Sequence, residues 1–300
     1  MYNEKRKRQF LSEKREYAKI SNNLTNLFDA AEPREEMYKQ DLCEWNSDRI
    51  IEFYKYYSTS SISSLVVLNT ALREYTTWCM ENGMVTDNQN HYGEISSEAL
   101  CKCVDISRLK ETVFTRDELI SKLKELINYT DRFVLLGLFE GIPNSVICDV
   151  KLSDLSGNSI TLSNGKQLDI SEELVRTMRH ADEETEYISM TKTEKAFPYV
   201  PSDTIIKRTA KAKENVMSNT VVVGSKVRRC ARYFGIPTLT IKNLVESGRL
   251  HYISEIAKEN GITVEEVIKG KKYRKMFEDR YGKVQNLMTY WLTYGQTICG

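Results

Sequence analysis

Lysine and arginine gather in short runs along this chain, and these are the residue types that bind phosphate groups. The runs cover Lys5–Arg8, Lys207–Lys213, Lys226–Arg232 and Lys269–Lys275. Acidic residues collect elsewhere, at Glu32–Glu36 and Asp182–Glu186. The net charge is only +1, but a nearly neutral protein can bind nucleic acid if its positive charge lies on one face. Because such runs are more often solvated helix faces, the pattern allows nucleic-acid binding without establishing it.

Cysteine and histidine could carry other chemistry, as metal ligands or in disulfides. The chain has seven cysteines and three histidines: Cys43, Cys79, Cys101, Cys103, Cys148, Cys230, Cys299, His91, His180 and His251. The odd number of cysteines shows no paired spacing. A zinc site usually needs about four such ligands in a recognisable spacing, and here Cys101 and Cys103 flank only Lys102. We expect reduced thiols, no metal ion and no cofactor.

The composition is that of a globular protein with about two domains. Of its 300 residues, 41% are hydrophobic and 28% are charged, without a low-complexity tract or an internal repeat. No stretch approaches the roughly 18 apolar residues that a membrane-spanning helix needs. The charged start, Met1–Arg8, leads into no apolar run. We expect a soluble, cytoplasmic protein without a secretory signal and without a membrane partner.

Helical spacing of apolar residues dominates the first half of the chain. The predicted helices cover residues 5–28, 37–45, 49–57, 65–80, 115–127 and 130–140. Pro33 is expected to break the helical pattern, and Asp48 to cap the helix that follows it. Gly83 is placed to end the helix before it. Thr115 and Glu118 form a capping box, and the apolar density of 130–140 predicts a buried core helix.

The pattern changes after Pro143. Residues 159–162 and 167–170 alternate around Asn164-Gly165, and Asn-Gly is the strongest short signal for a hairpin. Tyr187–Met190 is a candidate for a third strand. Helices are then expected over 202–212, 227–234, 239–246, 250–259 and 264–281. The sequence therefore predicts a mainly α fold with one small β-sheet in its second half.

Three segments, in this order, resemble the phage integrase or tyrosine recombinase family. Residues 60–83 carry the pattern Leu-x-x-Leu-Asn-x-x-Leu-Arg-x-Tyr and are similar to a helix of the family's core-binding domain. Residues 131–155, DRFVLLGLFEGIPNSVICDVKLSDL, resemble the family's R-D-x-x-L-L-L-L-x-x-T-G-L-R-x-S-E-L-x-x-L-x-W-S-D-I box. Residues 235–248, GIPTLTIKNLVESG, resemble D-L-R-H-T-F-A-T-x-L-L-E-S-G. The resemblance implies a helical, SAM-like core-binding domain over 1–108 and an α+β tyrosine-recombinase-like domain over 109–300.

In this family a tyrosine attacks a DNA phosphate, two arginines clamp the phosphoryl oxygens, and histidines and a lysine assist proton transfer. The resemblance places the catalytic residues other than the lysine at Pro143, Pro237, Thr238, Glu259 and Ile268. Proline cannot donate a hydrogen bond, even from its backbone. Only Lys166, at the position of the hairpin lysine, matches the family. We expect no catalytic residues and no enzymatic activity.

Other tyrosines near the C-terminus could stand in for the missing nucleophile: Tyr273, Tyr281, Tyr290 and Tyr294. Without the arginine clamp, such a tyrosine would face an unstabilised transition state. Losing even one electrostatic contact of this kind commonly costs about a hundredfold in rate. We therefore expect these aromatic side chains to pack within the structure.

The two domains of the family clamp duplex DNA, and the clamp does not depend on the chemistry. Recombinase-fold proteins without catalysis serve as lytic-cycle master repressors of SPbeta-like prophages, and this sequence resembles them. The resemblance implies a sequence-specific repressor of phage lytic genes that acts at the nucleoid of a bacterial host. Two alternatives stay open: an active, divergent recombinase, which would form a covalent adduct with DNA, and a protein-interaction module that kept only the fold.

The side chains expected at the DNA are cations, because phosphate contacts supply most of the affinity. They are Arg73, Lys166, Lys207, Arg208, Lys211, Lys226, Arg228, Arg229 and Arg232. Lys207, Arg208 and Lys211 are expected on one helix. Arg228 and Arg232 are one turn apart and share a helix face.

The partners implied are double-stranded operator DNA, a second copy of the chain, and a regulatory peptide or protein. A homodimer could form through the C-terminal residues Tyr290, Trp291, Leu292 and Ile298. Packing within the same chain is the competing interpretation for these four residues.

Overall fold

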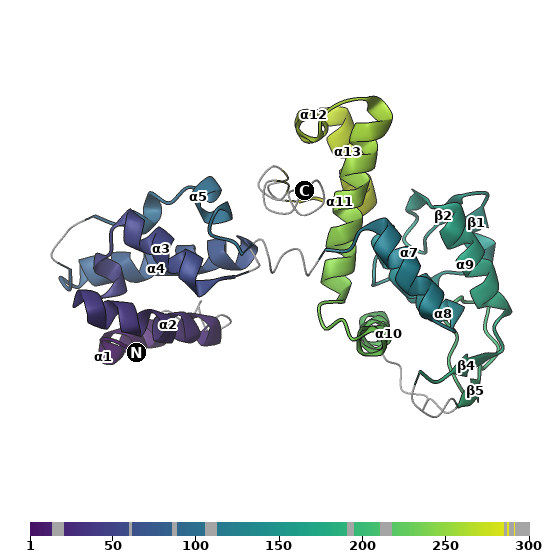
Figure 1. Cartoon of the computed structure of the whole chain (residues 1–300), viewed down its shortest axis with the longest axis horizontal. Coiled ribbons are helices and arrows are strands. Elements are labelled where there is room, and N and C mark those ends of the chain that lie inside the picture. Colours follow the sequence, from purple (N-terminus) through teal and green to yellow (C-terminus); the bar gives the residue numbers. More distant parts are fainter. Residues whose placement is uncertain are drawn as a thin grey trace. The chain divides into compact units, whose positions relative to one another are not determined.

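The computed structural model divides the chain into two compact units, which are considered separately. It describes residues 1–13, 21–59, 62–85, 89–105, 113–190, 195–210, 218–284, 287 and 291. The described residues up to Asp105 belong to the first unit, and those from Val113 to Leu287 belong to the second. Helices dominate both units, and the described strands lie in the second unit (Figure 1).

The first unit is a group of helices with α4 (Ile62–Glu81) at its centre. The other helices are α1 (Glu4–Glu13), α2 (Ser21–Tyr38), η2 (Leu42–Glu44), α3 (Ser47–Tyr57), η3 (His91–Gly93) and α5 (Ser97–Cys101). Helix α4 buries Leu65, Leu68 and Tyr75 at helical spacing, as the sequence pattern predicted. The Tyr75 ring lies 5.2 Å from the Phe10 ring of α1 and 5.3 Å from the Phe28 ring of α2, between centroids.

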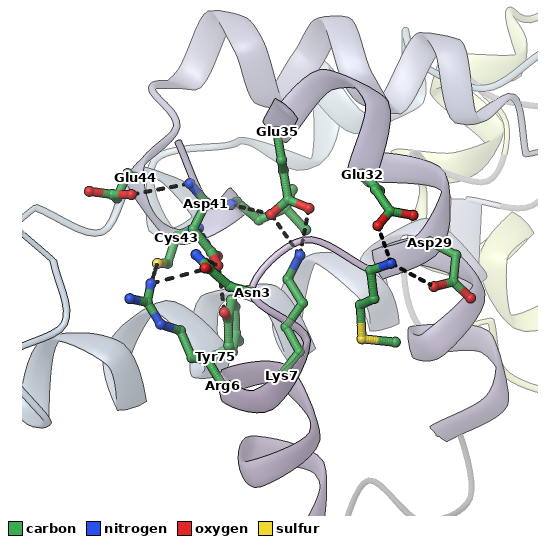
Figure 2. A network of polar contacts seen from close by, with 12 residues as sticks. Asn3, Arg6, Lys7, Asp29, Glu32, Glu35, Asp41, Cys43, Glu44 and Tyr75 are labelled. Atoms are coloured by element: carbon green, nitrogen blue, oxygen red, sulfur yellow. Dashed lines mark hydrogen bonds and ion pairs between the residues drawn. The ribbon is translucent and has the colours of Figure 1, made fainter. Parts of the chain in front are cut away.

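A buried polar network joins α1 to α2 and η2 (Figure 2). The Lys7 ammonium lies 2.5 Å from a carboxylate oxygen of Glu35, and neither side chain is exposed. Asp41 is also buried, accepts a hydrogen bond of 2.9 Å from the Tyr75 hydroxyl, and lies 3.6 Å from the Arg6 guanidinium. Because both buried carboxylates face a cation, the network can hold α1 on the unit without an uncompensated charge.

Three predictions for the first unit are wrong. Pro33 lies inside α2 instead of breaking it, because the burial of residues such as Phe28 and Ala31 outweighs one missing hydrogen bond. Asn46, not Asp48, caps α3, which begins at Ser47. In place of a helix over 37–45, α2 ends at Tyr38 and only the short η2 follows.

The second unit is built around α8 (Tyr129–Phe139), in which every residue from Phe133 to Phe139 is buried. The predicted core helix is thus confirmed. Helix α8 packs against α9 (Glu172–Glu183), α10 (Asn219–Phe234) and α11 (Ile241–Asn260) (Figure 1). The unit also contains α7 (Arg116–Glu125), η4 (Ile147–Asp149), η5 (Leu152–Asp154), α12 (Val264–Lys269) and α13 (Lys271–Tyr281). Helix α7 begins at the predicted capping box of Thr115 and Glu118.

The predicted hairpin is present as β2 (Ser159–Thr161) and β3 (Gln167–Asp169), with Ile160 opposite Leu168. Gly165 adopts a φ of +80° in its turn, a conformation that glycine adopts without strain. The third strand of this sheet is β1 (Leu155–Ser156). The strand predicted near Tyr187 exists as β4 (Glu186–Ile188), but it pairs with β5 (Ala196–Pro198) in a separate sheet.

Two helix predictions in this unit are corrected by the packing. The described residues 202–210 form no helix and are held instead by isolated bridges such as Tyr199 to Thr209. The segments 239–246 and 250–259 belong to one helix, α11, which continues through Gly248. A Cβ at Gly248 would lie 1.7 Å from the carbonyl oxygen of Phe139. This glycine therefore permits the close crossing of α11 over α8 and does not end a helix.

The 264–281 segment is likewise two helices, α12 and α13, with Gly270 between them. Among the helices that the structure describes, none is both long and apolar enough to span a bilayer. Among the residues that the structure describes, no three acidic, cysteine or histidine side chains form a group that could hold a metal ion.

Candidate nucleic-acid interface

Pro143 occupies the turn that follows α8, where the resemblance places the first catalytic arginine. Its carbonyl accepts hydrogen bonds from the N–H groups of Val146 and Ile147, at 3.1 and 3.0 Å. Gly141, two residues earlier, has a φ of +96°. The chain thus makes a tight turn at this position, and Pro143 offers it neither a cation nor an N–H donor.

Pro237 and Thr238 lie in the connection between α10 and α11, where the resemblance places an arginine and a histidine. Pro237 is exposed. The Thr238 carbonyl accepts a hydrogen bond of 2.7 Å from the Asn243 side chain, which holds the connection against the first turn of α11. Neither side chain could carry positive charge toward a phosphate.

The positions expected for the last histidine and the nucleophile also lack suitable groups. Glu259 is exposed near the end of α11, and Ile268 is a buried apolar side chain of α12, 6% exposed. The nearby Tyr281 hydroxyl donates a hydrogen bond of 2.6 Å to the Phe139 carbonyl, and burial raises its pKa. Both effects oppose ionisation of this tyrosine. Tyr290 and Tyr294 lie outside the described residues.

Lys166, which matches the family's lysine, is tied to the end of α13. Its ammonium donates a hydrogen bond of 2.6 Å to the Arg280 carbonyl, and burial, with the Arg280 charge nearby, lowers its pKa. Arg280 in turn donates to the carbonyls of Glu140 and Asp169. The lysine therefore fastens the β2–β3 hairpin to α13.

Lys226 and Arg229 belong to an internal polar group of the second unit. The Lys226 ammonium lies 2.8 Å from one oxygen of the buried Asp131, and the Tyr187 hydroxyl donates to the other at 3.0 Å. The Arg229 guanidinium lies 4.9 Å from the centre of the Tyr187 ring. Because Lys226 is 8% exposed, it does not lie on a solvated basic face, contrary to the expectation from the sequence.

Arg228 and Arg232 are exposed on one side of α10, as their spacing predicted. Together with Lys242, in the first turn of α11, they line a cavity of about 930 Å³ that also reaches Pro237. We call this cavity the α10 groove; its other lining residues are Gly224, Val227, Ala231, Gly235, Leu239, Thr240 and Ile241. Three cations thus lie beside Pro237, one of the two positions where the resemblance places a catalytic arginine.

The 207–211 segment is organised differently from the prediction. Lys207 is not on a helix, and its ammonium donates hydrogen bonds to the carbonyls of Asp182 and Glu184, so it fastens the chain to the end of α9. Arg208 is exposed, and its carbonyl accepts a hydrogen bond from the Val200 N–H. Lys211 lies outside the described residues.

In the first unit, Arg73 lies on the exposed face of α4. The other exposed residues of α4 are small hydroxyl- or methyl-bearing side chains and two acidic ones: Ser63, Ser64, Val66, Val67, Thr70, Thr77, Glu74 and Glu81. Sequence reasoning missed these residues and Lys242. A signal was available for α4, since Val66 and Val67 fall between the buried Leu65 and Leu68 at positions that a helix turns outward.

Comparison with known proteins places the chain in a family. A family model described as "MrpR, N-terminal core-binding domain" matches residues 1–81, and one described as "MrpR, C-terminal catalytic domain" matches residues 113–290. The chain belongs to the MrpR family. The core-binding and recombinase-like domains appear in the order that the sequence motifs predicted, and this expectation is confirmed.

The chain is also similar to a curated protein, the "SPbeta prophage-derived uncharacterized protein YopR" of Bacillus subtilis (strain 168). The two are 26% identical over 254 residues, which is 79% of this chain and 77% of YopR. Two crystal structures of lambda integrase dimers bound to a COC′ core site are similar at 14% identity and a TM-score of 0.42. They cover 92% of this chain, and the chain covers 71% and 88% of theirs.

Proposed function

We propose that this MrpR-family protein is a sequence-specific repressor that binds double-stranded DNA and carries out no strand cleavage. By occupying operators it would exclude polymerase from phage lytic genes and so maintain lysogeny. Membership of the family and similarity to a prophage-derived protein support this setting. The observation that carries the proposal is a contrast: uncharged or acidic residues stand at the positions expected for the catalytic arginines, histidines and tyrosine, while exposed cations line the groove that reaches one of these positions, Pro237.

The case against catalysis rests on charge. Phosphoryl transfer needs donors aimed at oxygens that gain negative charge in the transition state. Pro143 and Pro237 can supply neither charge nor a donor, and Ile268 is a buried hydrocarbon where a nucleophile would be required. The hydroxyl of Tyr281 donates its hydrogen bond to a backbone carbonyl, that of Phe139. Each of these features opposes the chemistry independently.

The case for DNA binding rests on the second unit's exposed cations and the surface of α4. Arg228, Arg232 and Lys242 are placed to contact phosphates, which give affinity but no sequence information. The exposed face of α4 carries groups that can contact base edges: methyl groups for thymine, and the carboxylates of Glu74 and Glu81 as acceptors for cytosine. The hydroxyls of Thr70 and Thr77 donate to carbonyls of their own helix and can accept. We assign phosphate binding to the α10 side and base reading to α4 with Arg73.

A reporter gene tests repression directly. Promoter-bearing segments of the genome that encodes the chain are placed before the reporter, and expression should fall when the chain is produced. A nicked suicide substrate that contains the same segment tests the alternative of an active recombinase. Non-covalent retention without a covalent adduct is the expected result. An adduct that survives denaturation would show that the chain is an enzyme, and repression without DNA binding would favour the protein-interaction alternative.

A further inference from the structure

The α10 groove has a composition that DNA alone does not explain. Along α10, Gly224, Val227 and Ala231 follow one another at spacings of three and four residues, so they form an apolar stripe on one side of the helix. Val227 and Ala231 are 2% and 8% exposed and also belong to the core of the unit, so they form the base of the groove and contribute little surface to it. Ile241 of α11 completes the apolar wall. Val221, 47% exposed, continues the stripe by one more turn toward the start of α10. The stripe therefore extends over about three helical turns.

The charges around this stripe have one sign. Arg228 and Arg232 flank it on α10, and Lys242 faces it from α11. Among the described residues that line the groove, none carries a carboxylate. Its volume, about 930 Å³, is large enough for several side chains. A groove with an apolar floor and a cationic rim is complementary to a partner with apolar side chains and negative charge.

We propose that the α10 groove binds an acidic, amphipathic peptide segment of a partner protein. Phosphates of duplex DNA can reach the exposed arginine tips, but a sugar–phosphate backbone carries no apolar side chain to fill the floor between them. A helical or extended peptide can pair with the arginines and also fill the floor. It can insert apolar residues at helical spacing and present carboxylates to the two arginines. The length of the stripe also favours a peptide over a compact small molecule.

Such a peptide would act on DNA binding, and this consequence rests on the proposed function. Arg228 and Arg232 cannot pair with phosphates and with peptide carboxylates at the same time. Binding of the peptide and of DNA would then be mutually exclusive, and the peptide would release the protein from its operator. The assignment of the groove as a peptide site does not depend on this competition, because peptide binding can be measured without DNA.

The probe is a fluorescein-labelled synthetic helical peptide with leucines along one face and glutamates along the other, titrated into the full chain. A peptide with glutamine in place of glutamate, and a scrambled peptide, are the controls. The groove-filling variant is Gly224→Leu, because a Cβ at Gly224 would meet only Ile241 Cδ1, at 3.9 Å. We expect saturable binding that weakens by about tenfold or more for the glutamine peptide and for Gly224→Leu.

A photo-crosslinkable version of the peptide provides a second readout if Gly224→Leu fails to fold. Crosslinks within residues 221–242 of the wild-type chain are expected. Crosslinks elsewhere, equal binding of the scrambled peptide, or unchanged binding to folded Gly224→Leu would overturn the proposal. So would a concentration-dependent dimer that Gly224→Leu abolishes, since the groove would then be an interface between two copies. Peptide binding in a chain that binds no DNA would contradict the proposed function and leave the groove assignment standing.

Discussion

Lys226 and Asp131 form an ion pair inside the second unit, with 2.8 Å between the lysine Nζ and the carboxylate Oδ1. Arg228, two residues further along the same helix, points into solvent at the α10 groove. One basic run therefore supplies both a structural cation and a cation available to a ligand. Replacing Lys226 should therefore lower the stability of the unit, whereas replacing Arg228 should weaken ligand binding and leave the stability nearly unchanged.

Lys226→Met should destabilise the second unit strongly, because it leaves the Asp131 carboxylate buried without its cation. Breaking a buried ion pair by removing one partner costs about 3–5 kcal/mol. Arg228→Met, the matched change at an exposed position of the same helix, should alter the free energy of unfolding by less than about 0.5 kcal/mol. Urea unfolding of both variants measures this difference. Equal stability of the two would show that the Lys226–Asp131 pair does not exist in solution.

Arg228→Glu/Arg232→Glu should weaken DNA binding and make it less dependent on salt. Each lost phosphate contact lowers the slope of log affinity against log salt by about 0.9, so the double variant should lose about two units of slope. Arg176→Glu/Arg179→Glu carries the same charge change on α9 and serves as the control. Binding isotherms at several salt concentrations give the slopes. The same loss in both double variants would point to overall charge and not to the α10 surface.

Gly248→Ala should destabilise the contact between α11 and α8. The added Cβ would overlap the Phe139 carbonyl, at 1.7 Å, so the helices must move apart. Overpacking of this kind costs about 1–3 kcal/mol. Gly224→Ala is the matched control, since its Cβ would make only an ordinary contact, 3.9 Å from Ile241 Cδ1, and it should stabilise the helix by up to about 1 kcal/mol. In thermal unfolding, the midpoint should fall for Gly248→Ala and rise for Gly224→Ala. An unchanged midpoint for Gly248→Ala would contradict the close crossing of α11 over α8.

The Glu35 carboxyl should make the first unit less stable as the pH rises toward neutrality. Burial raises its pKa to about 7, although the Lys7 ammonium opposes the shift. The folded state thus binds a proton that the unfolded state releases near its ordinary pKa. The stabilisation that this bound proton gives to the folded state is complete below the ordinary pKa of a glutamate. It is lost as the pH rises through about 7.

Urea unfolding between pH 5 and pH 8, followed by tryptophan fluorescence, measures this dependence. Lys7→Met/Glu35→Leu is the control, because it replaces the buried pair by apolar side chains of similar size and removes the titrating group. Its stability should vary less with pH over this range. An unchanged pH dependence in the double variant would assign the effect to other groups.

The sequence predicted those parts of the fold whose signals are local. The capping box of Thr115 and Glu118, the Asn164-Gly165 hairpin and the apolar density of α8 each specify an element by themselves. Pro33 does not break its helix, and the predicted gap between residues 246 and 250 is absent, because tertiary packing decides both outcomes. Pro33 lies inside a helix that packs on the core, and Gly248 lets two helices touch.

The candidate site could be predicted only as a set of charges. Lys226 and Arg228 are alike in sequence, and which of them faces the core depends on the phase of the helix. That phase was readable, since Val223, Val227 and Cys230 mark the buried side of α10 and Lys226 falls within it. Lys207 could not have been assigned in this way, because its carbonyl partners, Asp182 and Glu184, come from a distant segment.

The most direct test of the account is to enrich DNA on the purified chain. Fragmented DNA from the genome that encodes the chain is incubated with it, and the retained fragments are sequenced and measured again at several salt concentrations. Recurrent short sites near promoters, with an affinity that falls steeply as salt rises, are the predicted result. An absence of enriched sites at moderate salt would contradict a sequence-specific repressor and favour a protein-interaction role for the recombinase-like fold.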